Sequence, residues 1–484
     1  MTTTPPESHP RLAIAVLCAA GVVVAVMQTI IVPLIPSLPT LLKTSQTNAS
    51  WALTITLLVG SVITPIAGRL GDMFGKKRMV VASMAAVSVG SAVCALAPGL
   101  FVFMIGRGLQ GLGIGTIALG ISLMRDIVPA ERLSGSVGAM SASLGVGGSL
   151  GLPFAAAIAD NLNWHALFWV SAAVALLAGV AVVVTVPDHG TPTGGRFDYP
   201  GAAGLTVLLT CILLAVSKGN EWGWGSPVTL GLFAGFVVST IWWCRWERRR
   251  ENPLVDLRLN VRRAVLLTNL ASIASGFAFY AMQMIPIQIL MAPTGANAAG
   301  SLGFGLSMVL ASLVLMPGGL VMFVFSSVSA ALTGRYGARV SLSLGSLVMG
   351  GSYTVLLVMI TGPWAGNWMW LLAANILSGA GLGIAYSAMP ALIMRWVPVS
   401  HTGEANGVNA LMRSVGTSLA TAAVGMILSA STVAVQTSGG TAVPLPSSGA
   451  YVWGVCIALT TCLLATVTAL SIPARRPVDE ETVV

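Results

Sequence analysis

The sequence predicts an all-α integral membrane protein with fourteen transmembrane helices, arranged as two six-helix halves with two inserted helices between them. Three observations lead to this fold class. The chain carries too few charges for a soluble protein, its apolar runs are long enough to cross a bilayer, and its basic residues gather in every second connection between those runs.

Composition is the first observation. Of the 484 residues, 55% are hydrophobic and only 8% are charged, whereas roughly a quarter of the residues of an ordinary globular protein are charged. The chain also contains 55 glycines, and small residues allow membrane helices to approach closely. This composition argues against a soluble enzyme.

The net charge of +9 does not indicate nucleic-acid binding, because the basic residues lie between apolar runs and not with aromatic residues on one solvated face. The six cysteines show neither CxxC spacing nor adjoining histidines. We therefore expect no disulfide, no metal ion and no cofactor.

The apolar runs are the second observation, since a helix needs roughly 20 apolar residues to cross the hydrocarbon layer. The predicted spans are 12–33, 51–68, 79–97, 101–121, 133–158, 164–186, 201–217, 228–244, 264–291, 303–331, 340–361, 367–391, 406–430 and 450–472. The first run is too long for a signal-peptide core and no Ala-x-Ala site follows it, so we expect it to be retained.

The basic residues are the third observation. An even number of spans places both termini on one side, and 20 of the 24 lysines and arginines fall in the tails and connections on that side. Lys43 and Lys218 fall on the other side, and Arg107 and Arg413 lie within spans. The positive-inside rule then predicts cytoplasmic termini for a multi-pass protein of the bacterial inner membrane.

An internal repeat divides the chain into halves. The glycines of 111–115 recur in 379–383 at an offset of 268 residues, which is longer than six spans with short loops require. Chance similarity between glycine-rich helices is the alternative, but further pairs follow in the same order. The predicted divisions are tail 1–11, first half 12–186, inserted helices 187–263, second half 264–472 and tail 473–484.

The connection between the second and third spans reads GRLGDMFGKKR and closely resembles the cytoplasmic loop motif of the major facilitator superfamily. Its characteristic residues are Gly68, Gly71, Asp72, Gly75, Lys76, Lys77 and Arg78. The resemblance implies a conformational latch in which the aspartate holds one half against the other. The second copy has Gly334 in place of the aspartate. A charged turn that only sets topology is the alternative.

The fifth span contains Gly138, Gly147, Gly151 and Pro153, which resemble the antiporter motif that distinguishes exporters in that superfamily. The usual closing double glycine is replaced by alanines. Together with the fourteen spans, these motifs resemble the fourteen-span drug/proton antiporter family over essentially the whole chain.

In the fourth span, Arg107 and Gln110 resemble the buried arginine motif of the same family. A mid-membrane arginine is costly unless it faces a wet cavity or an internal partner, so one hypothesis places it in the substrate cavity. The other is a brace that binds carbonyl groups of the first span. The candidate cavity residues are Gln28, Arg107, Gln110, Phe277, Tyr280, Met282, Gln283, Phe304 and Asn375.

The first span departs from the family. Met27 occupies the position of the aspartate that relatives often use for proton handling, and no acidic residue lies well inside any span. Proton coupling is therefore implied by the resemblance but not supported by this chain's own residues. A cavity without a central carboxylate suits neutral, amphipathic or anionic substrates better than compact dications.

The leading functional hypothesis is a secondary active exporter of hydrophobic or amphipathic small molecules, of the multidrug efflux type, working by alternating access. A lipid or glycolipid exporter is the alternative, and a membrane-embedded acyltransferase is the least favoured because all four histidines are terminal or in loops. The expected partners are an amphipathic small molecule and membrane lipids, with protons left open and no nucleic acid. We expect a monomer.

Overall fold

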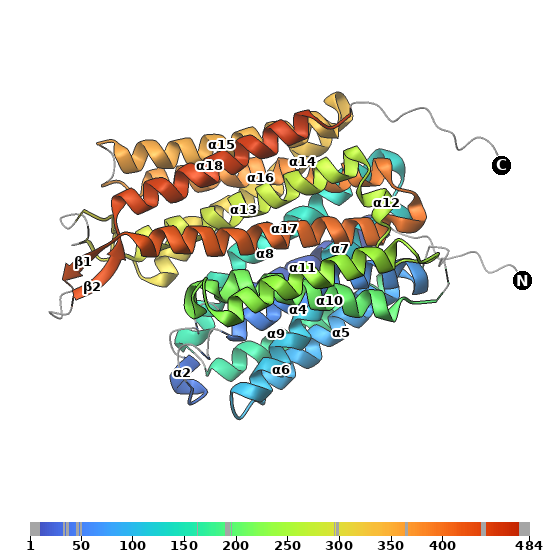
Figure 1. Ribbon diagram of the computed structural model, residues 1–484, viewed down its shortest axis with the longest axis horizontal. Coiled ribbons are helices and arrows are strands. Elements are labelled where there is room, and N and C mark those ends of the chain that lie inside the picture. Colours follow the sequence, from blue (N-terminus) through green and yellow to red (C-terminus); the bar gives the residue numbers. More distant parts are fainter. Residues whose placement is uncertain are drawn as a thin grey trace, which may run out of the picture.

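The computed structural model is almost entirely helical, and fourteen of the helices in the described part of the chain are long and apolar enough to cross a membrane (Figure 1). The structure describes residues 10–31, 34, 38–44, 48, 51–161, 163–188, 194, 196–294, 296, 300–363, 366–436 and 442–473. The predicted tails 1–11 and 473–484 therefore lie almost wholly outside the described residues. The predicted fold class is confirmed.

The fourteen spans are formed by thirteen continuous helices and one interrupted helix. The continuous ones are α1 (Pro10–Thr29), α4 (Trp51–Phe74), α5 (Lys76–Ala95), α8 (Ala130–Asn161), α9 (Trp164–Thr185), α10 (Tyr199–Trp222), α11 (Pro227–Glu247), α13 (Arg263–Met291), α14 (Met308–Tyr336), α15 (Ala338–Thr361), α16 (Met369–Trp396), α17 (Thr402–Ala430) and α18 (Ser448–Leu470). Several begin or end a turn beyond the predicted apolar run, because a helix continues into polar residues at the membrane surface.

The fourth span is the interrupted one. It was predicted as one run, 101–121, but consists of α6 (Leu100–Gly111), a single 3₁₀ turn η2 (Leu112–Gly115) and α7 (Thr116–Ile127). Glycine-rich segments have low helix propensity. A methyl group added at Gly113 would overlap the side chain of Val87 of α5, so the tighter turn lies against α5.

The short elements lie between the spans. They are α2 (Leu38–Leu41), α12 (Leu257–Asn260), the 3₁₀ turn η4 (Val399–His401) and the strands β1 (Thr432–Gln436) and β2 (Ala442–Pro446). The two strands pair antiparallel, with Thr432 opposite Pro446. The predicted all-α fold did not include this hairpin, which is too short and too far from the membrane core to show in the pattern of apolar runs.

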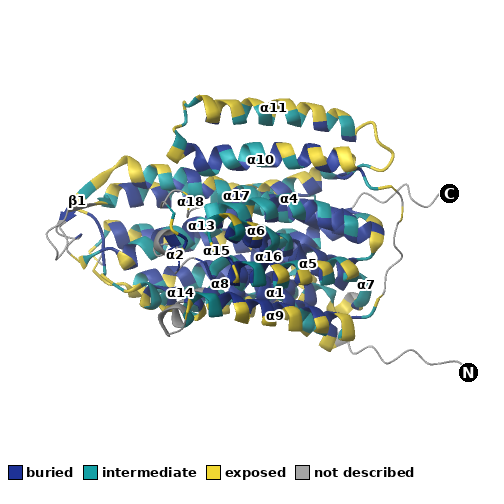
Figure 2. Cartoon of the chain, turned by 90° about the horizontal axis from the view of Figure 1, so that it is seen from below, coloured by how far each residue is buried: buried dark blue, intermediate teal, exposed yellow. Residues whose placement is uncertain are grey.

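Two large apolar cores follow the two halves of the sequence. One is built from residues between Ala13 and Val186, with a single contribution from α16, and the other from residues between Leu259 and Ile472. The helices α10 and α11 form an outer layer, in which α10 packs against α4 and α17 (Figure 2). Only 11% of the apolar membrane-spanning stretch of α11 is buried, compared with 83% of that of α16. The helix α11 is therefore peripheral and α16 is central.

The first helix begins and the last helix ends at the same end of the bundle, opposite the β1–β2 hairpin (Figure 1). Lys218 differs from its predicted place in the connection at the hairpin end. It lies inside α10 and is only 2% exposed. Its Nζ is 2.9 Å from Glu221 Oε1 and lies 5.1 Å from the centre of the Trp51 ring. These contacts offset the cost of burying its charge and let α10 extend past the apolar run.

Candidate functional site

A central cavity lies between the two halves and holds about 880 Å³ of space, counting the part open to solvent. The first half contributes α1, α4, α8 and the interrupted fourth span, and the second half contributes α13, α16 and α17. The lining residues are Gln28, Leu57, Ser61, Ile114, Ile117, Ala118, Ser141, Leu144, Phe279, Tyr386, Ala410, Arg413, Ser414, Thr417 and Ser418.

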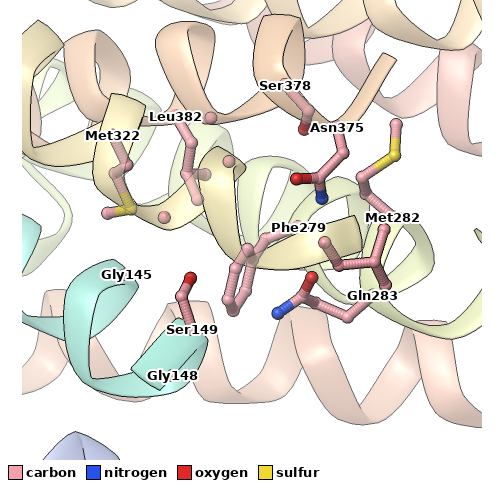
Figure 3. Close-up of a pocket in the computed structure, with 14 residues that line it drawn as sticks. Gly145, Gly148, Ser149, Phe279, Met282, Gln283, Met322, Asn375, Ser378 and Leu382 are labelled. Atoms are coloured by element: carbon pink, nitrogen blue, oxygen red, sulfur yellow. The ribbon is translucent and has the colours of Figure 1, made fainter. Parts of the chain in front are cut away.

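A smaller pocket of about 390 Å³, again counting the part open to solvent, lies between α8, α13, α14 and α16 and shares Phe279 with the central cavity. Figure 3 shows the amide groups of Gln283 and Asn375 directed into the same space, with Ser149 of α8 across from them. Asn375 Oδ1 is buried and has no hydrogen-bond partner among the described residues. The described residues that line this pocket therefore offer neutral polar groups and no charge.

The structure separates the predicted cavity residues into three groups. Gln28 lines the central cavity, and Met282, Gln283 and Asn375 line the smaller pocket. A second group belongs to the apolar core of the second half or packs against it: Phe277, Tyr280 and Phe304. The role of all these residues in binding stays a prediction.

Arg107 and Gln110 form the third group and lie outside both cavities. Arg107 is completely buried. Its Nε donates to the carbonyl of Ala52 at 3.1 Å, and its Nη1 donates to the carbonyl of Met27 at 3.2 Å and to Gln110 Oε1 at 2.6 Å. Gln110 in turn donates to Ser91 Oγ at 2.8 Å. In this structure Arg107 has the geometry of the brace hypothesis, because it ties α6 to α1, α4 and α5.

Arg413 is the arginine that does line the central cavity. Sequence reasoning placed it within a span but assigned it no function. Its position inside a span of the second half is the sequence feature that could have indicated a cavity residue. The motif that resembles the family's buried arginine lies around Arg107 instead. Neither cavity has an aspartate or glutamate among its described lining residues.

Asp72 of the predicted latch connects the two halves. Its Oδ1 accepts the backbone N–H of Gly403 at 3.1 Å, and its Oδ2 accepts that of Glu404 at 2.9 Å. Both N–H groups belong to the first turn of α17, where they have no partner within the helix and the helix dipole is positive. The carboxylate of the first half thus caps a helix of the second half.

The backbones of α4 and α17 touch at the same place. A methyl group added at Gly68 would overlap the carbonyl of Gly403, and one added at Gly407 would lie 2.8 Å from the carbonyl oxygen of Thr64. A second bridge comes from Arg125 of α7, whose Nη1 donates to Thr402 Oγ1 at 2.7 Å. The two halves are therefore closed against each other at the end where α1 begins.

The remaining latch residues act within the first half. Gly75 has φ +107°, which favours glycine at the turn between α4 and α5. Lys76 Nζ lies 2.8 Å from Asp126 Oδ2, and Lys77 Nζ donates to the carbonyl of Val183 at 3.0 Å. The last two are Gly71, which packs against the side chain of Leu119, and Arg78, which is exposed.

The glycines of the antiporter-type motif in α8 lie at two helix contacts. A methyl group at Gly138 would lie 3.0 Å from the carbonyl oxygen of Ser326 of α14 in the second half. One at Gly147 would lie 2.6 Å from the carbonyl oxygen of Val22 of α1. Gly151 and Pro153 follow in the same helix, and Gly151 also faces α1. The motif therefore lets α8 approach both its own half and the opposite one.

Two groups of packed helices that close on each other at one end, with a cavity between them, define the architecture of a secondary membrane transporter. The chain belongs to the Major Facilitator Superfamily, whose family model matches residues 17–421. It is accordingly a multi-pass membrane protein of a superfamily of transporters.

Relatives and solved structures agree with this assignment. An uncharacterised MFS-type transporter of Mycobacterium tuberculosis is 29% identical over 411 residues, which cover 84% of this chain but only 58% of that protein. Multidrug resistance protein 3 of Bacillus subtilis is 26% identical over 75% of this chain and 69% of its own length. The crystal structure of a human organic anion transporter shares the fold, with a TM-score of 0.64 at 14% identity and coverage of 96% and 100%.

Proposed function

We propose that the protein is a secondary active exporter of hydrophobic or amphipathic small molecules that works by alternating access in the bacterial inner membrane, with both termini cytoplasmic. The observation that carries the proposal is the central cavity between the halves, next to an end closed by Asp72 and Arg125. With cytoplasmic termini, the closed end faces the cytoplasm.

The contacts between the halves support alternating access. At the closed end, α17 is held against α4 by the two hydrogen bonds of Asp72 and against α7 by Arg125. These are few polar contacts, made at an edge of the interface, so they can break together when the halves rock. A substrate from the cytoplasm enters the cavity when they open.

The chemistry of the lining supports an amphipathic substrate. Side chains such as Leu57, Ile114 and Phe279 offer an apolar wall, whereas Gln28, serine hydroxyl groups and a single arginine provide polar contacts. The relative named multidrug resistance protein 3 and the exporter-type glycines of α8 favour efflux over uptake. Neither cavity has a carboxylate among its described lining residues, so the lining gives no support for proton coupling. The transport experiment tests coupling separately.

The test is transport by the purified full chain in liposomes. Fluorescent dansyl amphiphiles and a fluorescent phospholipid are offered with and without an imposed pH gradient. Protein-dependent movement of the amphiphiles supports the proposal, and its dependence on the gradient decides proton coupling. Movement of the phospholipid alone would replace the proposal with lipid export, and no movement above protein-free liposomes would overturn it.

A further inference from the structure

Arg413 lies near the middle of α17. Among the described residues that line the central cavity, it is the only one with a charged side chain. A cation at this depth is costly unless it faces water or a partner of opposite charge. In the described part of the chain Arg413 forms no ion pair. Glu404 lies nine residues earlier on the same helix, about 13 Å away along its axis, and accepts the backbone N–H of Asp256.

The position of Arg413 is set by close packing of α17 on α13. A methyl group at Gly276 of α13 would overlap the carbonyl of Arg413, and one at Gly416 of α17 would overlap the carbonyl of Ile273. The two backbones touch at the arginine itself and again three residues later. Its Cα is therefore held by main-chain contacts and not by the side chain itself.

The guanidinium is oriented by an amide chain. Arg413 Nη1 donates to Asn409 Oδ1 at 2.8 Å, and Asn409 Nδ2 donates to Asn269 Oδ1 at 3.0 Å and to Ser272 Oγ at 2.7 Å, both on α13. Because the amide nitrogen of Asn409 is engaged by α13, its oxygen faces the arginine. The guanidinium is thus positioned before any ligand arrives, which lowers the entropy cost of binding.

One face of the guanidinium is covered by an aromatic ring, and most of its donors remain available. Its carbon atom lies 5.2 Å from the centre of the Tyr386 ring, within the range of a cation–π contact. Among the described residues, only Nη1 has a hydrogen-bond partner, although a guanidinium carries five N–H donors. The arginine therefore presents a planar fork that matches a carboxylate or sulfonate.

The first half supplies a polar group with no partner of its own. Ser141 of α8 lines the same cavity and is 5% exposed, and its hydroxyl has no hydrogen-bond partner among the described residues. Phe279, whose ring centre lies 6.1 Å from that of Tyr386, continues the apolar wall beside the arginine. The cavity thus combines one fixed positive charge, an unused hydroxyl and an aromatic surface.

We propose that Arg413 recognises an anionic head group and that the transported class is amphipathic organic anions, with a carboxylate or sulfonate on an apolar body. The head binds the fork of Arg413, and the body lies along Phe279 and Tyr386. This inference rests on the proposed function and narrows its substrate class.

The experiment compares three probes that share the dansyl group: dansylglycine is an anion, dansylglycinamide is neutral and dansylcadaverine is a cation. Binding to the purified full chain is measured by fluorescence, and transport is measured in liposomes. Arg413→Gln should weaken dansylglycine binding by about tenfold or more, the usual effect of losing a hydrogen bond to a charged group. It should change dansylglycinamide binding less than threefold. Arg413→Lys should give an intermediate loss, because it keeps the charge without the fork.

Arg335→Gln is the matched control. Arg335 also lies over a tyrosine ring, 5.4 Å from the centre of Tyr336, but it is exposed at the end of α14. This variant removes the same charge and the same type of contact outside the cavity, so it should bind all three probes like the parent. Unfolding temperatures of all variants separate loss of binding from loss of folding.

The inference is overturned if the parent does not prefer dansylglycine or if Arg413→Gln weakens all three probes equally at an unchanged unfolding temperature. In both cases continued transport of any probe leaves the proposed function standing. If the glutamine variant does not fold, the lysine variant decides by keeping or losing the preference for the anion. If no probe binds or moves, both the inference and the proposed function fail.

Discussion

Two arginines that lie within membrane spans show how the environment sets the use of a residue. Arg107 is fully buried, and its Nε and Nη1 donate to the carbonyls of Ala52 and Met27 and to Gln110, whereas its Nη2 has no hydrogen-bond partner among the described residues. Arg413 makes one hydrogen bond and lines the cavity. The first arginine stabilises the first half, and the second is available to a ligand.

The brace geometry of Arg107 leads to a stability prediction. Arg107→Gln should lower the free energy of unfolding by roughly 1.5–3 kcal/mol, since it removes charge-assisted hydrogen bonds to the buried carbonyls of Ala52 and Met27. Arg107→Lys should lose most of the same stability, because lysine cannot reach several acceptors with one planar group. Thermal unfolding in detergent and membrane abundance measure both. Normal stability with lost transport would instead place Arg107 in the binding site.

At the scale of single elements, the contact between α4 and the first turn of α17 is the main link between the halves. In this contact the Asp72 carboxylate accepts two backbone N–H groups of α17, and the two backbones touch at Gly68 and Gly407. Hydrogen bonding and close packing therefore both hold α17 against α4. The carboxylate can only reach both N–H groups because Gly68 lets the backbones touch.

We expect Asp72→Ala to reduce turnover about tenfold or more while substrate affinity changes little, because the lost charge-assisted hydrogen bonds stabilise one conformation and do not touch the cavity. Transport in liposomes and equilibrium binding in detergent separate the two quantities. Asp188→Ala removes an exposed carboxylate beyond α9 and serves as the control. Equal losses of affinity and turnover in Asp72→Ala would argue against a latch.

Gly68 and Gly334 make a matched pair for a steric test. A methyl group at Gly68 overlaps the carbonyl of Gly403, whereas one at Gly334 meets open space. Gly68→Ala should therefore loosen the closed end, and Gly334→Ala should stabilise α14 by up to about 1 kcal/mol. A cysteine placed at Thr417 in the cavity reports the opening through its alkylation rate in inside-out vesicles. An unchanged rate in Gly68→Ala would contradict the close contact.

At the scale of the whole molecule, each half has its own apolar core, and the inserted pair packs on the outside against α4 and α17. The cavity and the latch both lie between the halves, so relative motion of the halves changes them without disturbing either core. The division at 12–186, 187–263 and 264–472 stays a prediction about which residues move together.

Cysteine labelling checks the topology that underlies the proposed direction of transport. In a variant without native cysteines, a cysteine at Lys43 or Gly225 should react with a membrane-impermeant maleimide in intact cells, because both residues lie in connections at the hairpin end. A cysteine at Arg250, beyond α11, should react only after permeabilisation. Reaction at Arg250 in intact cells would reverse the orientation.

The helix count and the loop motif around Asp72 could be recognised in the sequence because both depend on local information, and the latch role of that loop stays a prediction. Apolar length decides a span, and the latch motif is one contiguous connection. The burial of Lys218 could not be predicted in this way, because it depends on Glu221 and on Trp51 of another helix. The 3₁₀ turn at Leu112–Gly115 could not be predicted either, because it lies against Val87 of α5.

The sequence by itself determined the membrane class, the fourteen spans and the superfamily, because hydrocarbon thickness and chain composition leave few other ways to satisfy the backbone. The tertiary structure alone decided which arginine faces the cavity. The helical period tells which residues share a face, but the neighbouring helices decide what that face meets. Arg107 meets the backbone carbonyl of Met27, whereas Arg413 meets the central cavity.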